Sequence, residues 1–179
     1  MFTSLSLLDL EFFAEETIIT IVPNFTEASI NLITGKFGPF KAQKPTDVPL
    51  WLALYLRTRS KCSLTVPMCY NVEYLNKKLE DEKEYKNYLT PLPDNFFEIF
   101  HLLFQKAKED FEDAMQSKSL LEDIKQVRLS KLTKIVKDLN KQDSYVIFDN
   151  ITDYELNIFR PLAGEAFNKL NELKKIGAN

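Results

Sequence analysis

The sequence predicts an α+β protein that is mainly α-helical, with a small β-rich domain before an α-helical bundle domain. The first domain is expected at residues 1–65, with one short helix, and the second at residues 66–179. β-Branched runs and turn signals concentrate before about residue 65, as is typical of strands. After Pro67, apolar residues recur at steps of three and four, as is typical of amphipathic helices.

Strands are expected at three places in the first domain. Residues 17–22 are β-branched throughout and end at Pro23-Asn24, which predicts a strand closed by a turn. A second strand is expected over 30–33, with 37–40 as a bent continuation that Pro39 restricts to a sheet edge. A third is expected over 61–66. A unit of about 60 residues with so few strands buries little apolar surface, so we expect it to pack against something else.

A short helix is predicted after Asp47, which can serve as its N-cap, with Pro49 in its first turn and an end near Arg59. Residues 50–56 are apolar nearly all round, and such a helix must be covered on more than one side. The candidate subunit or domain contacts on this helix are Trp51, Leu52 and Tyr55.

Longer helices are predicted over 72–88, from 94 or 95 to about 115, and over 120–140. In the second of these helices, phenylalanines at 96, 100, 104 and 111 form one apolar stripe. Ile99 and Leu102 fall outside this stripe, so they too are candidate subunit or domain contacts. Residues 152–155 have capping-box spacing and predict a short helix that ends at Arg160-Pro161. A last helix is expected through 167–173.

Arg128 falls in the middle of the apolar stripe of the helix over 120–140. Because arginine is almost never fully buried without a partner, we expect a carboxylate to face it. An ion pair within the bundle, or an aliphatic stem on the core with its head in water, is the favoured interpretation. A contact between subunits is the alternative, so Arg128 completes the set of interface candidates.

The sequence offers little material for an enzyme. His101 is the only histidine, and Cys62 and Cys69 lack the spacing of a zinc site. The Gly35–Gly38 segment lacks the order of a nucleotide-binding loop. No set of nucleophile, base and orienting group can be assembled. We therefore expect no enzymatic activity and no cofactor or metal, with both cysteines as ordinary thiols.

Charge and hydropathy argue against a membrane and against general nucleic-acid binding. No apolar run approaches the roughly 18 residues that a membrane span needs. The formal net charge is −3, from 23 basic and 26 acidic residues. Lys134, Lys137 and Lys141 nevertheless gather on the solvent side of the helix over 120–140, where they are candidates for weak contact with phosphate. A helical nucleic-acid-binding module that uses this face is the alternative function.

Several strings of residues, in order and spacing, resemble the eukaryotic GINS subunit family called partner of Sld five, number two. In the first domain they are AEETIITIVPNF at 14–25, Ile33-Thr34-Gly35, Gly38-Pro39-Phe40 and DVPLWLA at 47–53. Further on they are Lys61-Cys62, Pro67, 72–75, the joint at 90–93, Arg128 with Lys131-Leu132, and the polar segment 149–157. The resemblance covers almost the whole chain, which starts about nine residues before the family's usual start.

The resemblance implies a non-enzymatic scaffold subunit that assembles with three sister subunits into the GINS heterotetramer. It implies that this complex joins the MCM motor ring and the cell-division-cycle forty-five protein in the replicative helicase, in the nucleus, during initiation and elongation of DNA replication. DNA would be contacted only indirectly or weakly, and ATP hydrolysis would belong to the motor ring.

Overall fold

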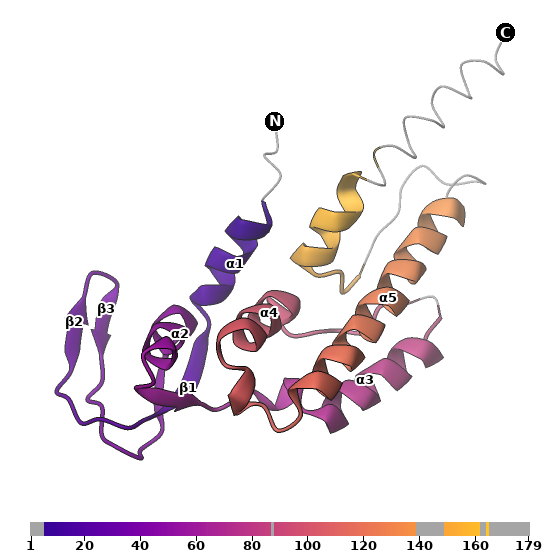
Figure 1. The fold of residues 1–179 in the computed structure, drawn as a ribbon. Helices are drawn as coiled ribbons and strands as arrows, with labels where there is room; N and C mark the ends of the chain where they lie inside the picture. The colour runs from indigo at the N-terminus through magenta and orange to yellow at the C-terminus, as the bar shows by residue number, and fades with distance from the viewer. Residues whose placement is uncertain (1–5, 87, 139–148, 162–163, 165–179) are drawn as a thin grey trace, which may run out of the picture.

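The computed structural model describes residues 6–86, 88–138, 149–161 and 164, without the side chains of 135–138. Within them the protein is α+β and mainly α, which confirms the predicted fold class. Strands and two short helices form the N-terminal part, and longer helices form the rest (Figure 1). No described helix combines the length and apolar character needed to cross a bilayer.

A three-stranded antiparallel sheet is the centre of the N-terminal part. Its central strand β1 (Ile18–Pro23) lies between β4 (Thr46–Pro49) and β5 (Cys62–Leu64). Ile19 pairs with Val48 and Ile21 with Leu64, and these four side chains are buried. The β-branched pattern therefore correctly predicted β1, and β5 lies inside its predicted range.

A separate hairpin of β2 (Ile30–Leu32) and β3 (Gly35–Phe37) extends to one side of the molecule (Figure 1). The expected continuation over 37–40 is wrong, because β3 ends where that continuation was to begin. A physical reason is that Pro39, which follows a cis Gly38-Pro39 bond, has no backbone N–H to donate to a strand ladder. Only an isolated bridge between Phe40 and Glu27 follows.

Helix α2 (Leu50–Thr58) begins later than predicted. Asp47 does not cap it, because Asp47 lies in β4, and its carboxylate accepts a hydrogen bond from Thr20 Oγ1 at 2.6 Å. A proline ring sterically disfavours the helical conformation in the residue before it, so Val48 stays extended. Pro49 is then the N-cap of the helix.

Helix α1 (Leu7–Glu15) was not predicted. Ser6 and Asp9 form a capping box at its start: the Asp9 amide donates to Ser6 Oγ at 3.2 Å, and the Ser6 amide donates to Asp9 Oδ2 at 2.8 Å. Leu10 and Ala14 are its buried residues, and it packs against α4 and α2. The Ser6-x-x-Asp9 spacing was the signal that could have revealed this helix.

The C-terminal part is a set of packed helices. A short 3₁₀ turn η1 (Met68–Tyr70) leads into α3 (Val72–Glu84), followed by α4 (Phe96–Lys106), η2 (Lys108–Asp110) and α5 (Ala114–Asp138). Figure 1 shows α3 beside α5, which contact each other along their lengths. A further helix over 153–161 follows the predicted capping box at Thr152.

The helix predicted from 94 or 95 to about 115 is in fact divided into α4, η2 and the first residues of α5, which begins at residue 114 rather than 120. The break is at Ala107, whose φ of −137° leaves the helical region. Phe111 is buried in the connection after the break. The apolar spacing in the sequence therefore extends past the point where the helical backbone ends. The helix expected through 167–173 lies outside the described residues.

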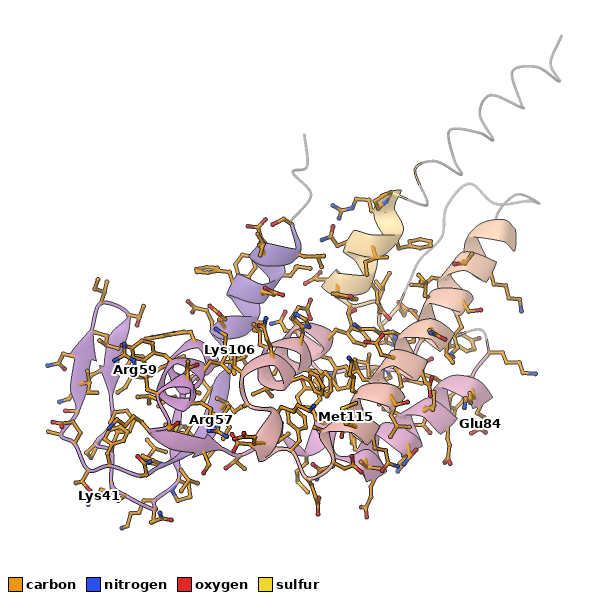
Figure 2. All side chains as sticks on the ribbon, in the orientation of Figure 1. Lys41, Arg57, Arg59, Glu84, Lys106 and Met115 are labelled. Atoms are coloured by element: carbon orange, nitrogen blue, oxygen red, sulfur yellow. The ribbon has the colours of Figure 1, made fainter. Side chains whose placement is uncertain are left out.

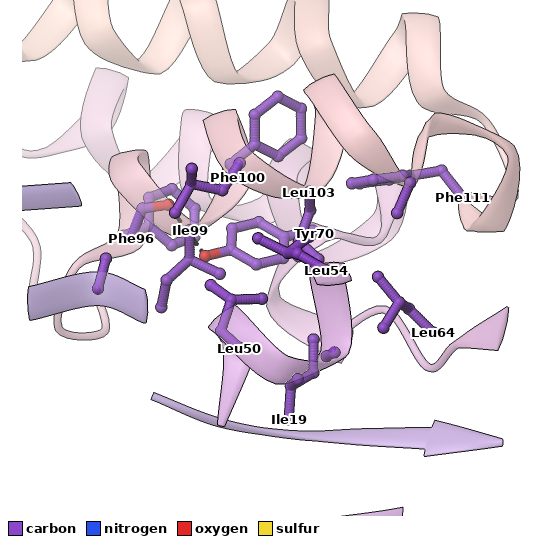
Figure 3. Close-up of a cluster of buried hydrophobic side chains, with 14 of the residues drawn as sticks. Ile19, Leu50, Leu54, Leu64, Tyr70, Phe96, Ile99, Phe100, Leu103 and Phe111 are labelled. Carbon is purple, nitrogen blue, oxygen red and sulfur yellow. Dashed lines mark hydrogen bonds between the residues drawn. The ribbon is translucent and has the colours of Figure 1, made fainter. Parts of the chain in front are cut away.

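One continuous hydrophobic core joins the two parts of the chain. Figure 3 shows Leu50, Leu54 and Leu64 of the N-terminal part close to Tyr70 and Leu103 of the helical part. The Tyr70 hydroxyl lies within this core and donates a hydrogen bond to the carbonyl of Phe96 at 2.9 Å. The small β-rich unit thus gains its missing cover from helices of the same chain. A smaller cluster of Leu89, Leu132 and Phe159 joins α5 to the helix over 153–161.

Candidate interaction site

Arg128 is the centre of a buried ion network. Its side chain projects from α5 and is 0% exposed. Nε and Nη2 donate to the two carboxylate oxygens of Glu155 at 2.5 and 2.9 Å, and Nη1 donates to Glu82 Oε1 at 2.5 Å. The carbonyls of Thr90 and Asn150 each accept a bond at 2.7 Å. All five N–H donors of the guanidinium are therefore satisfied within the chain.

These contacts support the intramolecular interpretation of Arg128. As expected, carboxylates face it, but both come from the same chain, and no donor remains for a sister subunit. Burial alone would lower the pKa of Arg128, but Glu155 and Glu82 outweigh burial, so the pKa is raised above its ordinary value. Arg128 is thus an internal anchor.

Lys131, one turn along α5, completes the network. Its ammonium group donates to Glu82 Oε2 and, at 2.8 Å, to the carbonyl of Tyr88. Burial would raise the pKa of Glu82, but hydrogen bonds from Lys131 and Thr90 and the charge of Arg128 outweigh it and lower that pKa. Two buried carboxylates thus meet two buried cations, and formal charge is balanced.

The network ties together segments that are far apart in the sequence. Arg128 and Lys131 come from α5, Glu82 from α3, and Glu155 from the helix over 153–161. Glu155 also accepts from the amide and hydroxyl of Thr152 at 3.0 Å, so the same carboxylate caps its own helix. This arrangement fixes that helix against α3 and α5.

A third buried carboxylate, Glu98 in α4, was missed by sequence reasoning. It is 3% exposed, and neither oxygen has a hydrogen-bond partner among the described residues. Burial raises its pKa, and the negative charges of Asp153 and Glu155 raise it further, against the opposing charge of Lys125. Acidic residues in the first turn of a helix are usually exposed, so the sequence did not predict the burial of Glu98.

The other interface candidates separate into covered and accessible residues. Leu52, Ile99 and Leu102 are buried within the chain's own core. Their apolar surface is therefore covered within the chain, which fits the domain-contact alternative for these candidates. Trp51 is half-buried, with its ring edge-on to Phe37. Their role in subunit contact stays a prediction.

Tyr55 is the accessible member of that set. Its side chain is exposed on α2, and the Arg59 guanidinium lies 4.3 Å from its ring centroid. A cation held over an aromatic face in this way is stabilised by the ring quadrupole. Tyr55 is therefore available to a partner, whereas its neighbour Leu52 is not.

Exposed apolar side chains are concentrated on α1. Leu8 and Phe12, one turn apart, are 75% and 62% exposed, and Leu7 and Phe13 are also exposed. Phe12 and Phe13 contact each other edge-to-face with centroids 5.9 Å apart. Apolar surface gathered on one helix, rather than scattered singly, is typical of a contact with another protein.

The candidate phosphate contacts are only partly described. Lys134 is exposed on α5, and Lys137 belongs to the last turns of the same helix. Lys141 lies outside the described residues. The nucleic-acid face therefore stays a prediction.

The remaining chemically interesting residues form no centre. His101 is exposed, and its Nε2 lies 4.0 Å from Glu11 Oε1 of α1. Cys62 and Cys69 are free thiols, and burial raises the pKa of each to about 11. Within the described part of the chain, no three His, Cys, Asp or Glu residues are placed to hold a metal ion.

Comparisons with known proteins agree with the architecture. A family model described as the PSF2 N-terminal domain matches residues 6–65, and one described as the GINS complex protein helical bundle domain matches residues 69–174. Since the first match begins at residue 6, residues 6–9 of the segment expected to precede the family's usual start lie inside the family domain.

Curated relatives match over most of their length. DNA replication complex GINS protein PSF2 of Homo sapiens is 34% identical over 93% of this chain and 90% of its own. Its counterpart in Candida albicans is 34% identical over 92% and 81%, and that in Xenopus laevis is 32% identical over 93% and 90%. The resemblance found in the sequence is thereby confirmed, and the chain belongs to the PSF2 family of GINS complex subunits, whose members act in DNA replication.

Proposed function

We propose that this protein is a non-enzymatic scaffold subunit that assembles with three sister GINS subunits into a heterotetramer. Membership in the GINS family supports the existence of such partners. The observation that carries the proposal is the exposed apolar surface of α1, defined by Leu7, Leu8, Phe12 and Phe13. Covering one such side chain is worth about 1.5–3 kcal/mol relative to leaving it in water.

The capping box and the buried side of α1 support its role as a docking helix. Ser6 and Asp9 fix its start, and Leu10 and Ala14 anchor it against the core. The backbone of the helix is thus already ordered while Leu8 and Phe12 face outward, so a partner need not fold this segment on binding.

We further propose that the assembled complex works in the nucleus with the MCM motor ring and the cell-division-cycle forty-five protein as an accessory part of the replicative helicase. In this role the chain positions other proteins and contacts DNA only indirectly or weakly. The two parts of the chain share one hydrophobic core, which supports a subunit whose parts keep a fixed arrangement.

The proposal is tested by co-expression with the three sister subunits, followed by sizing and mass measurement. We expect a particle with one copy of each subunit. The double variant Leu8→Glu with Phe12→Glu should remain folded, because both side chains are exposed, yet drop out of the particle. Met115→Glu, at an exposed apolar residue at the start of α5 (Figure 2), is the matched control and should assemble normally.

Two results would contradict the proposal in different ways. A wild-type chain that stays monomeric beside its sisters would exclude the assembly itself. A particle that retains the α1 double variant as well as the Met115→Glu control would exclude α1 as the contact while leaving the assembly intact.

A further inference from the structure

A groove of about 460 Å³ runs between α3 and α5. Residues of α3, the segment just after it and α5 line the groove: Glu82, Lys83, Lys86, Gln126, Val127, Ser130, Lys131 and Lys134. Figure 1 shows the two helices side by side. Glu82 and Lys131 belong to the Arg128 network, so this network holds the two walls of the groove at a fixed separation.

The groove carries uncompensated positive charge. Lys83, Lys86 and Lys134 are exposed, and none of the three forms an ion pair with any described residue. The single carboxylate of the groove, Glu82, is already bonded to Lys131 and Arg128. The formal net charge of the chain is −3, so the protein as a whole would not attract an anionic partner. Attraction of such a partner would have to come from these three lysines.

The floor of the groove is apolar. Val127 is half-buried between the lysines, and the methylene stems of lysine side chains add apolar surface beside it. Gln126 and Ser130 place amide and hydroxyl groups at the edge. A ligand that uses all these features carries carboxylates along its flanks and an aliphatic side chain between them.

This combination fits a protein segment better than a nucleic acid. Single-stranded nucleic acids gain binding energy by stacking bases on aromatic rings, and the residues that line this groove include none. Duplex binding depends on neutralising many phosphates, and an apolar floor adds nothing to it. We propose that the groove between α3 and α5 binds an acidic, amphipathic segment of a partner protein, with its carboxylates on Lys83, Lys86 and Lys134 and an aliphatic side chain on Val127.

Fluorescence anisotropy of the full chain tests this proposal without any sister subunit, so its outcome is independent of the heterotetramer. The probe is a labelled helical peptide of two heptads, with glutamates on two edges and leucines between them. The same peptide with glutamine for every glutamate is the reference. We expect the glutamate peptide to bind about tenfold more tightly, since each exposed ion pair adds a modest increment.

The double variant Lys83→Glu with Lys134→Glu should weaken binding of the glutamate peptide about tenfold or more. Its matched control is Lys77→Glu with Lys106→Glu, which changes net charge equally at exposed lysines outside the groove and should bind like the wild type. Equal thermal melting of both variants and the wild type verifies that the fold is retained.

The proposal is overturned if the glutamate and glutamine peptides bind equally, or if the two double variants weaken binding equally. It is also overturned if a labelled oligothymidine binds more tightly than the glutamate peptide and is lost only in the groove variant. That last pattern would assign the groove to nucleic acid.

Discussion

Two arginines join distant segments of this protein in different surroundings. Arg57 of α2 reaches across to η2, where Nε donates to Asp110 Oδ2 at 2.7 Å and Nη2 donates to Glu109 Oε2 at 3.0 Å (Figure 2). Its side chain is 17% exposed, and that of Glu109 is 87% exposed. Arg128 makes the same kind of forked contact with no exposure to water.

The difference shows that surroundings, rather than the pairing itself, decide what an arginine contributes. At Arg57, water can solvate Glu109 if the arginine is lost, and Asp110, although only 10% exposed, keeps the bond from the Leu64 amide, so less energy is at stake. At Arg128, loss of the guanidinium leaves the buried Glu155 without its cation and the buried Glu82 with Lys131 alone, which is strongly unfavourable. The first cluster aligns two parts of the chain, and the second is required for the packing of the helices.

The largest expected effect tests this view directly. Arg128→Ala should lower the free energy of unfolding by about 3–5 kcal/mol, because two buried carboxylates lose a cation. Urea unfolding followed by circular dichroism measures it. Arg59→Ala, at an exposed arginine, is the control and should stay within about 1 kcal/mol of the wild type, because it loses only the contact with the Tyr55 ring. If Arg128→Ala were as stable as this control, burial would not decide how much an arginine contributes to stability.

The second test uses acid. The pKa of Glu82 is lowered below its ordinary value of 4.5, so the unfolded chain binds the proton more tightly. The stability from this carboxylate is therefore complete above about pH 4.5 and is lost as the pH falls through the lower folded pKa. Glu82→Gln should be about 2 kcal/mol less stable at neutral pH, with the difference shrinking in acid. Urea midpoints from pH 7 downward check this. A deficit that does not change with pH would contradict the assignment.

Glu98 sharpens the comparison with the opposite sign. Its raised pKa means that folding disfavours the charged form, so a penalty is present above the folded pKa and disappears below the unfolded one. Glu98→Gln should raise the free energy of unfolding by about 1 kcal/mol at pH 7 and have little effect near pH 4. Thermal melts at the two pH values measure the change. A destabilised variant at pH 7 would mean that the carboxylate has a stabilising partner.

The smallest effects are expected at the partly buried Arg57 cluster. Arg57→Ala should cost about 1 kcal/mol, because Asp110 keeps a second bond, from the Leu64 amide at 3.1 Å. Glu109→Gln should change stability by less than about 0.5 kcal/mol. Both differences should diminish at high salt. If Arg57→Ala cost as much as Arg128→Ala, burial would not be the deciding variable.

Elements with a strong local signal were predicted well. The β-branched run of β1 ends at a proline and an asparagine, and the Thr152–Glu155 capping box does open a helix. These features depend on neighbours within a few residues, so they are visible in the sequence. The elements that were predicted wrongly also depend on near neighbours. The Ser6–Asp9 capping box starts α1, and Pro49 keeps Val48 extended before α2.

The candidate site was predicted in outline only. An arginine in an apolar stripe indicated a facing carboxylate, but Glu82 was one of several charged residues in the run at 80–84 and could not be singled out. Ile99 and Leu102 were correctly recognised as extra apolar surface, yet the sequence could not show that the chain itself would cover them. The exposed face of α1 was missed together with its helix.

The amino-acid sequence by itself determined the succession of a β-rich part and a helical part, the mainly helical fold class and the PSF2 family, because side-chain periodicity, capping and motif order are properties of the chain. Only the tertiary structure decided which charges are compensated, which apolar residues stay accessible on α1, and that Lys83 and Lys134 face one groove. Burial and ion pairing depend on segments far apart in the sequence, 49 residues between Glu82 and Lys131 and 53 between Arg57 and Asp110, and their meeting is set by packing.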